Sequence, residues 1–178
     1  MKKRENRQGT VLVHTGEGKG KSSSGFGMVF RSAGWGMKVL VVQFIKGKWK
    51  TGEKKAAEQF DNIDWHVMGD GFTWVTKNPE QDIATARHTW EFAKERIKSE
   101  EYDLVMLDEI NYASGYGWIT GEEIAEFITN EKPAYLHLVM TGRNAQPEVI
   151  EVADTVTEMT MIKHAYKNGI KAQQGVEF

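Results

Sequence analysis

A glycine-rich segment that directly follows a short apolar run is the feature that most constrains this chain. The run Thr10–His14 is typical of a buried strand, and Thr15-Gly16-Glu17-Gly18-Lys19-Gly20-Lys21-Ser22-Ser23 comes next. In Ser22–Ala33 the apolar residues then recur three and four positions apart, which predicts a helix. A strand, a glycine loop and a helix in this order turn backbone N–H groups and the helix N-terminus towards one anion. A glycine-rich turn that binds nothing is the alternative, but the flanking strand and helix favour a phosphate-binding loop.

Two residues at the end of this loop carry the chemistry expected at a triphosphate. Lys21 supplies a mobile positive charge, and the hydroxyl of Ser22 can ligate Mg²⁺. The usual pattern is G-x-x-x-x-G-K-[ST], in which Gly20, Lys21 and Ser22 fit, while Thr15 stands at the first glycine position. We therefore expect the whole segment from Thr15 to Ser23 to bind the phosphates of a nucleoside triphosphate.

The second half of the predicted site is an apolar run that ends in two acids. Leu104–Leu107 is followed by Asp108 and Glu109. Carboxyl ends of parallel strands meet at one edge of a sheet, so these carboxylates should lie beside the loop, where Mg²⁺ or Mn²⁺ would be held. Alone, such a pair fits a solvated turn equally well. Together with the loop it predicts a nucleoside triphosphate site, without indicating which bond breaks.

Strand-like and helix-like patterns alternate along the rest of the chain. Further strands are expected at Val39–Phe44, Trp65–Met68, Tyr135–Met140 and Thr155–Glu158. Further helices are expected at Glu53–Phe60, Asp82–Ser99, Gly121–Asn130 and Pro147–Ala153. This alternation predicts a three-layer α/β/α sandwich with a mostly parallel sheet. Residues 9–178 would form one domain after a basic arm over residues 1–8, which is either a tail, as its composition favours, or a lid.

Composition excludes several classes of protein. The absence of cysteine excludes a disulfide framework, a thiolate metal site and a cysteine nucleophile. With 23 basic and 25 acidic residues the net charge is −2, which argues against nucleic-acid binding driven by charge. The most apolar run, Val39 to Ile45, is too short to span a membrane, and no signal-peptide pattern follows the basic N-terminus. We therefore expect a cytoplasmic protein with no membrane or nucleic-acid partner.

Three further segments follow predicted strands and distinguish the chain from other nucleotide binders. In Met68-Gly69-Asp70-Gly71-Phe72-Thr73-Trp74, two large aromatic residues stand among glycines, either as a plug packed into the core or as a platform for a flat apolar ligand. The second segment is Gln43-Phe44-Ile45-Lys46-Gly47. In the third, Thr141-Gly142-Arg143, the arginine is either a surface residue at a turn or a phosphate ligand.

Together these segments resemble the P-loop type of the ATP:corrinoid adenosyltransferase family. The resemblance runs from Gly9 to Phe178 through G-E-G-K-G-K-S-S, V-V-Q-F-I-K-G, G-D-G-F-T-W, V-M-L-D-E-I-N-Y, M-T-G-R and K-H-A-Y-K-N-G-I-K-A-Q-Q-G-V-E-F. The F-T-W segment and the K-A-Q-x-G ending are its most specific parts. The resemblance implies a P-loop NTPase (RecA-like) fold. It also implies transfer of the 5′-deoxyadenosyl group of ATP to the Co(I) of a reduced corrinoid, cobalamin or a precursor, with release of triphosphate, in adenosylcobalamin biosynthesis or salvage.

The resemblance also implies roles for single residues. Lys21 would neutralise the triphosphate, and Mg²⁺ would be held by Ser22, Glu109 and Asp108. Arg143 would contact a phosphate and Arg31 the nucleoside. The corrinoid would lie against Phe72, Trp74 and Met68, where the two aromatic rings exclude the lower axial ligand of cobalt and so ease its reduction. Lys21, Glu109, Phe72 and Trp74 are thus the expected catalytic residues, and the five histidines (His14, His66, His88, His137 and His164) are expected to be structural.

The expected partners are ATP, the corrinoid, an electron-donating reductase such as a flavoprotein, and a second copy of the chain in a homodimer. Glu17 departs from the family pattern, in which an asparagine is expected, and would either point outward or help with Mg²⁺. Two other functions fit the loop alone: a P-loop ATPase or phosphotransferase that releases ADP, and a binding module whose ATP state is read by another protein.

Overall fold

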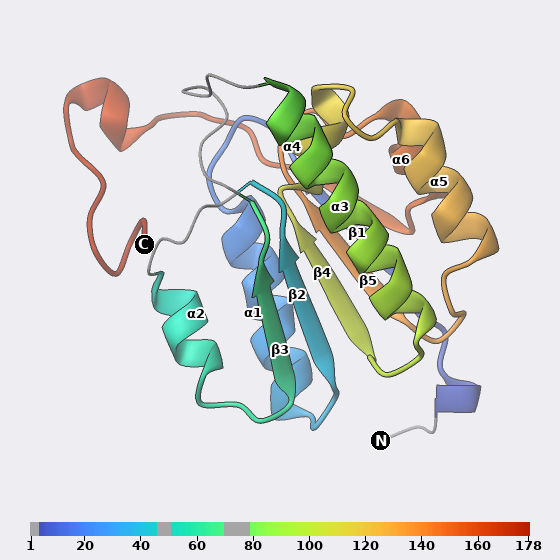
Figure 1. Cartoon of the computed structure of the whole chain (residues 1–178). Coiled ribbons are helices and arrows are strands. Elements are labelled where there is room, and N and C mark those ends of the chain that lie inside the picture. Colours follow the sequence, from blue (N-terminus) through green and yellow to red (C-terminus); the bar gives the residue numbers. More distant parts are fainter. Residues whose placement is uncertain (1–3, 46–50, 70–78) are drawn as a thin grey trace.

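A computed structural model of the chain describes residues 4–45, 51–69 and 79–178, and its elements alternate as expected (Figure 1). The strands are β1 (Val11–Thr15), β2 (Val39–Gln43), β3 (Ile63–Val67), β4 (Leu104–Asp108), β5 (His137–Thr141) and β6 (Thr155–Glu158). The helices are α1 (Lys21–Gly34), α2 (Gly52–Ala57), α3 (Pro79–Lys98), α4 (Ile110–Gly115), α5 (Gly121–Asn130) and α6 (Pro147–Val152). Short 3₁₀ helices lie at η1 (Arg4–Asn6) and η3 (Ala165–Asn168).

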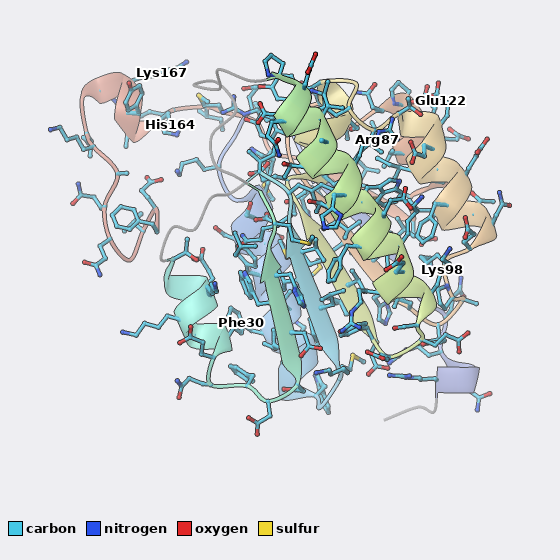
Figure 2. The ribbon with its side chains drawn as sticks, viewed as in Figure 1. Phe30, Arg87, Lys98, Glu122, His164 and Lys167 are labelled. Carbon is cyan, nitrogen blue, oxygen red and sulfur yellow. The ribbon has the colours of Figure 1, made fainter. Side chains whose placement is uncertain are left out.

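The six strands pair in parallel in the order β3-β2-β4-β5-β1-β6, and helices cover both faces of the sheet. On one face, Val39 and Val41 of β2 pack with Phe26 of α1. On the other, Leu40 belongs to the core built with α3 and α5. Figure 1 shows α1 behind the sheet and α3 and α5 in front of it, and Figure 2 places Phe30 of α1 across the sheet from the side chains of α3. Burial from both sides explains why the strands read as continuous apolar runs.

The strand order decides what lies beside the phosphate loop. β5 pairs with β1 on one side and with β4 on the other. The carboxyl ends of β1, β4 and β5 therefore meet at one edge of the sheet, and ligands of open parallel sheets bind at that edge. This arrangement brings together the glycine loop, the acidic pair and the segment with Arg143.

The predicted elements are found with shifted ends. Gly121–Asn130 and Thr155–Glu158 have the predicted bounds, whereas α3 begins at Pro79, where proline suits the first helical position. Helix α4 was not predicted, because it has only 6 residues and no side chain caps its start. Within the described parts of the chain, no helix is both long and apolar enough to cross a membrane.

Within the N-terminal arm, Arg4 and Arg7 bind to the body of the protein. Arg4 Nε and Arg7 Nη2 donate to Asp103 Oδ1 at 2.8 and 2.6 Å, and the backbone N–H of Lys38 donates to Asp103 Oδ2 at 2.9 Å. Both guanidinium groups also lie over the ring of Tyr135, at 5.2 and 5.4 Å. Asp103 and Lys38 precede β4 and β2, so residues 4–9 are fixed at the end of the sheet opposite the phosphate loop and cannot cover it.

Replacing Asp103 with asparagine should lower the free energy of unfolding by about 3 kcal/mol near neutral pH, because two guanidinium groups lose a buried carboxylate. Burial raises the pKa of Asp103, but hydrogen bonds from Arg4, Arg7 and Lys38 outweigh it and leave the pKa below its ordinary value. A lowered pKa stabilises the fold above the unfolded-state value of about 4, and this contribution is lost as pH falls further.

The measurement is urea unfolding across the acid range, with the exposed residue Asp61 changed to asparagine as the control. The Asp103 variant should lose less stability on acidification than the parent. Equal stability of parent and Asp103 variant at neutral pH would show that the arm contributes nothing.

Candidate nucleotide-binding site

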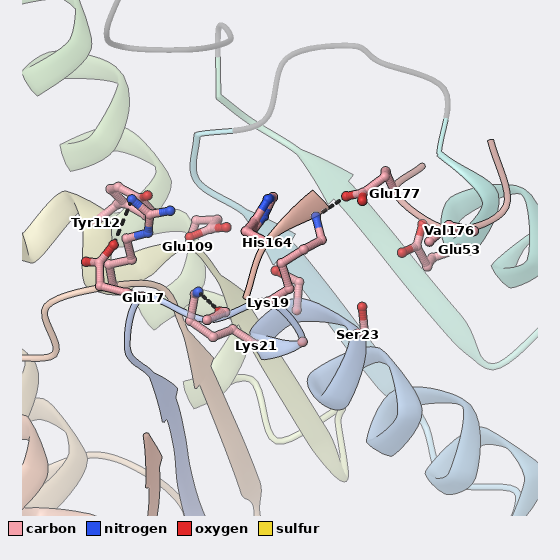
Figure 3. Close-up of a pocket in the computed structure, with 14 residues that line it drawn as sticks. Glu17, Lys19, Lys21, Ser23, Glu53, Glu109, Tyr112, His164, Val176 and Glu177 are labelled. Atoms are coloured by element: carbon pink, nitrogen blue, oxygen red, sulfur yellow. Dashed lines mark hydrogen bonds and ion pairs between the residues drawn. The ribbon is translucent and has the colours of Figure 1, made fainter. Parts of the chain in front are cut away.

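A cavity of about 290 Å³ opens at the carboxyl end of the sheet, where the phosphate loop meets the ends of β4 and β5 (Figure 3). Its floor is the loop from Glu17 to Ser23. The other lining residues come from five separate parts of the chain: Glu53, Glu109, Tyr112, Arg143, His164, Val176 and Glu177. The cavity therefore combines the predicted phosphate loop with both predicted flanking segments.

Glycines allow the loop its shape and its close contact with the chain that follows β6. Gly16 and Gly20 have φ angles of 95° and 109°, in the region that side chains disfavour. Gly18 N donates to Met159 O at 2.6 Å, and a Cβ atom on Gly18 would lie only 2.7 Å from that same oxygen. The loop is thus built directly on the segment after β6, as the Met159 N to Thr15 O hydrogen bond of 2.9 Å also shows.

Lys21 is the first residue of α1 and lies buried under the cavity. Its Nζ donates to Gly18 O at 2.6 Å, so the ammonium is held inside the curve of the loop. Burial lowers the pKa of Lys21, while nearby Glu109 partly offsets this shift. A buried cation at the N-terminus of a 14-residue helix makes this the most favourable place in the cavity for an anion.

The two acids after β4 lie in different environments. Asp108 is fully buried, and its carboxylate accepts from Gln43 Nε2 and from Thr141 Oγ1, each at 2.8 Å. Glu109 lines the cavity with a φ angle of 66°, and its backbone N–H donates to Thr141 Oγ1 at 3.0 Å. Asp108 therefore ties together the ends of β2, β4 and β5, and Glu109 is the acid that faces the cavity.

Two ion pairs lie at the rim of the cavity (Figure 3). Arg143 Nη1 is 3.2 Å from Glu17 Oε2, and the same guanidinium lies 6.0 Å from the centre of the Tyr112 ring. Lys19 pairs with Glu177, which belongs to the end of the chain. Glu17 therefore lies at the cavity rim, paired with Arg143.

Several predicted site residues lie outside the cavity lining. Thr15 Oγ1 accepts from Ala145 N at 3.2 Å behind the loop, and Gly16 packs against Met159. Arg31 lies exposed in the last turn of α1, about 15 Å along the helix axis from Lys21. Met68 packs against the larger core cluster of the protein. Phe72 and Trp74, like Lys46 and Gly47, lie outside the described residues.

Five lining residues were not predicted as site residues: Glu53, Tyr112, His164, Val176 and Glu177. Tyr112 follows the acidic pair on α4, a helix that the pattern did not reveal. His164 was expected to be structural, and it does accept from Tyr166 N at 3.1 Å while facing the cavity. The C-terminal segment had a signal in the sequence, since its K-A-Q-x-G ending was among the most specific motifs, but nothing indicated where it would lie.

No three histidine, aspartate or glutamate side chains are clustered as a metal site in the described ranges. A divalent ion in the cavity would thus need oxygen atoms from a ligand as well as from the protein. Such sharing is usual for Mg²⁺ bound with phosphates.

Comparison with known proteins identifies the family. The family described as ATP:corrinoid adenosyltransferase BtuR/CobO/CobP matches residues 7–178. The chain belongs to this family. Curated proteins named corrinoid adenosyltransferase match it at 49% identity in a Sinorhizobium species (100% of this chain, 84% of the relative) and at 52% in Pseudomonas aeruginosa (96% and 84%). One from Escherichia coli K12 is 40% identical over 98% of this chain and 88% of its own length.

Family membership confirms the expected enzyme class, a transferase. The fold also agrees with the one predicted from the sequence. Among solved structures, the cytoplasmic domain of EssC aligns with a TM-score of 0.51 and 14% identity, over 93% of this chain and 34% of that one. This similarity concerns the fold alone. With the phosphate loop between β1 and α1, it agrees with the expected P-loop NTPase fold.

Proposed function

We propose that this adenosyltransferase moves the 5′-deoxyadenosyl group of ATP to the cobalt of a reduced corrinoid. The electron pair of Co(I) forms the Co–C5′ bond, the C5′–O5′ bond breaks, and the oxygen leaves with its electron pair on inorganic triphosphate. The observation that carries the proposal is the convergence of the phosphate loop, Glu109 and Arg143 on one cavity in a chain of this family.

The cavity suits a leaving triphosphate. Lys19, Lys21 and Arg143 line it, and the N-terminus of α1 adds its positive end. Fixed positive groups that meet charge as it develops on a leaving group lower the barrier without reorganising during the reaction. In this proposal Lys21 is catalytic and the loop from Glu17 to Ser23 binds the phosphates, while contact between Arg31 and the nucleoside stays a prediction.

Ser22 and Glu109 are the residues that would hold Mg²⁺ or Mn²⁺. Both line the cavity, and one carboxylate with one hydroxyl leaves coordination positions for phosphate oxygens, as Mg²⁺ prefers. The ion would neutralise part of the triphosphate charge. Asp108, which already accepts hydrogen bonds from Gln43 and Thr141, would support the arrangement from below.

Glu109→Gln should lower the rate of adenosyl transfer by about 10-fold to 100-fold at low Mg²⁺ and raise the Mg²⁺ concentration needed for half-maximal rate. Glu53→Gln is a matched control, because it removes a carboxylate from the same cavity. The measurement is the initial rate across a Mg²⁺ titration. An equal shift in both variants would mean that Glu109 acts through its charge alone.

The corrinoid side of the proposal rests on the sequence. Phe72, Trp74 and Met68 would contact the corrinoid, and the rings of Phe72 and Trp74 would cover its lower face because they offer cobalt no lone pair. A chain without cysteine has no thiol of its own to reduce cobalt, so the electrons would come from a reductase such as a flavoprotein. We further propose a homodimer in the cytoplasm, as the resemblance and the composition suggest.

The proposal is tested by supplying Mg-ATP, a corrinoid and a strong reductant. The expected products are a light-sensitive Co–C compound, seen in the corrinoid spectrum, and inorganic triphosphate. Formation of ADP or free phosphate at the same rate with and without corrinoid would favour the ATPase or phosphotransferase instead.

A further inference from the structure

The lysine and arginine side chains that line the described cavity all have acceptors within the protein. Lys21 donates to the backbone oxygen of Gly18 at 2.6 Å. Arg143 pairs with Glu17 at 3.2 Å, and Lys19 pairs with Glu177. A triphosphate that binds these cations would therefore compete with acceptors of the protein itself.

The two carboxylates approach from opposite sides of Lys21 (Figure 3). Glu17 belongs to the loop itself and is mostly exposed, whereas its partner Arg143 is partly buried. Glu177 lies 158 positions from Lys19 in the chain and is the more buried member of its pair. The segment after β6 thus begins beneath the loop, at Met159, and ends on its outer side.

We propose that Glu17 and Glu177 are positioning residues that hold Arg143 and Lys19 until a triphosphate takes these cations over. This inference rests on the proposed nucleotide site and adds to it a role for the C-terminal segment and for a glutamate that departs from the family pattern. Both carboxylates occupy places that phosphate oxygens would take, so they lower the affinity for triphosphate. They also recapture the cations when the triphosphate leaves, which favours its release after transfer.

The strength of the pairs fits such an exchange. Ion pairs between partly exposed side chains are weak, and losing one changes an equilibrium by about twofold to fivefold. A polyanion with several phosphate groups outcompetes a single carboxylate at each cation. The carboxylates therefore moderate triphosphate binding without preventing it.

The test is equilibrium binding of inorganic triphosphate with Mg²⁺, measured by calorimetry. Glu17→Gln and Glu177→Gln should each bind it about twofold to fivefold tighter than the parent, and the double variant by roughly the product of the two factors. Glu131→Gln is the matched control, because it makes the same charge change in an exposed pair with Lys98 outside the cavity. It should bind like the parent. The gain in triphosphate affinity of Glu17→Gln and Glu177→Gln should shrink as the salt concentration is raised, because salt screens these ion pairs.

Lys21→Ala separates this inference from the proposed function. If Lys21→Ala binds triphosphate as well as the parent, the cavity is not the triphosphate site. The proposed function would then be wrong in placing the triphosphate of ATP in this cavity. If Lys21→Ala loses binding while Glu17→Gln and Glu177→Gln bind equally or more weakly than the parent, the site stands and the inference is overturned. Tighter binding in one glutamine variant alone would overturn the role of the other residue.

Discussion

Lys21→Ala should lower the rate of adenosyl transfer by about 100-fold to 1,000-fold, the loss typical of removing one preorganised group that stabilises transition-state charge. Lys21 is buried, and its Nζ is held at 2.6 Å from Gly18 O, inside the loop that would surround the triphosphate. A water molecule in its place brings no charge. The loss should appear in the chemical step, since negative charge grows on the triphosphate only as the C5′–O5′ bond breaks.

The measurement is a single-turnover rate with saturating ATP and corrinoid already reduced to Co(I). Lys98→Ala is the control, because it removes an equally charged side chain from α3, outside the cavity (Figure 2). Lys21→Arg should recover only part of the rate, since a planar guanidinium does not fit the place of a compact ammonium. A Lys21→Ala rate within a few-fold of the parent would remove Lys21 from catalysis.

Trp74→Ala should lower turnover at least tenfold when the corrinoid is supplied as Co(II) and must be reduced in the site. Without the indole, a lower axial ligand can return to cobalt, and the reduction potential falls. Each 59 mV of lost potential reduces the equilibrium amount of the one-electron-reduced form about tenfold. When Co(I) is supplied directly, this penalty disappears and the loss should be much smaller.

The comparison needs both assays on one protein preparation, with Trp35→Ala as the control. Trp35 is 74% exposed at the end of α1, so its loss removes an indole without touching the cavity. Equal losses from Co(II) and from Co(I) in Trp74→Ala would show that the residue supports the fold and does not act on cobalt.

The layers of the fold could be predicted from the sequence, but the strand order could not. Apolar runs such as Val39–Phe44 mark strands buried on both faces, and the spacing within Asp82–Ser99 marks a helix with one buried side. Nothing local shows that β5 pairs with both β1 and β4, because pairing depends on which faces the helices cover. Helix α4 was missed since it is held by packing and not by a cap.

The candidate site likewise has parts that could be predicted from the sequence and parts that could not. The loop from Glu17 to Ser23 could be located from local chemistry alone, because glycines and Lys21 stand next to one another in the chain. The burial of Asp108 could not be predicted from local chemistry, because it depends on Gln43 and Thr141 from neighbouring strands. The pairing of Lys19 with Glu177 joins opposite ends of the chain and leaves no trace in local spacing.

The position of bond cleavage in ATP is the most direct measurement of the proposed reaction. ATP labelled with ¹⁸O at the O5′ bridge is turned over with reduced corrinoid, and the released triphosphate is weighed by mass spectrometry. Attack of cobalt on C5′ leaves the label in the triphosphate and forms one Co–C bond for each triphosphate released. ADP as the product, or unlabelled triphosphate with the label retained on adenosine, would mean that the protein breaks a P–O bond and is not acting as an adenosyltransferase.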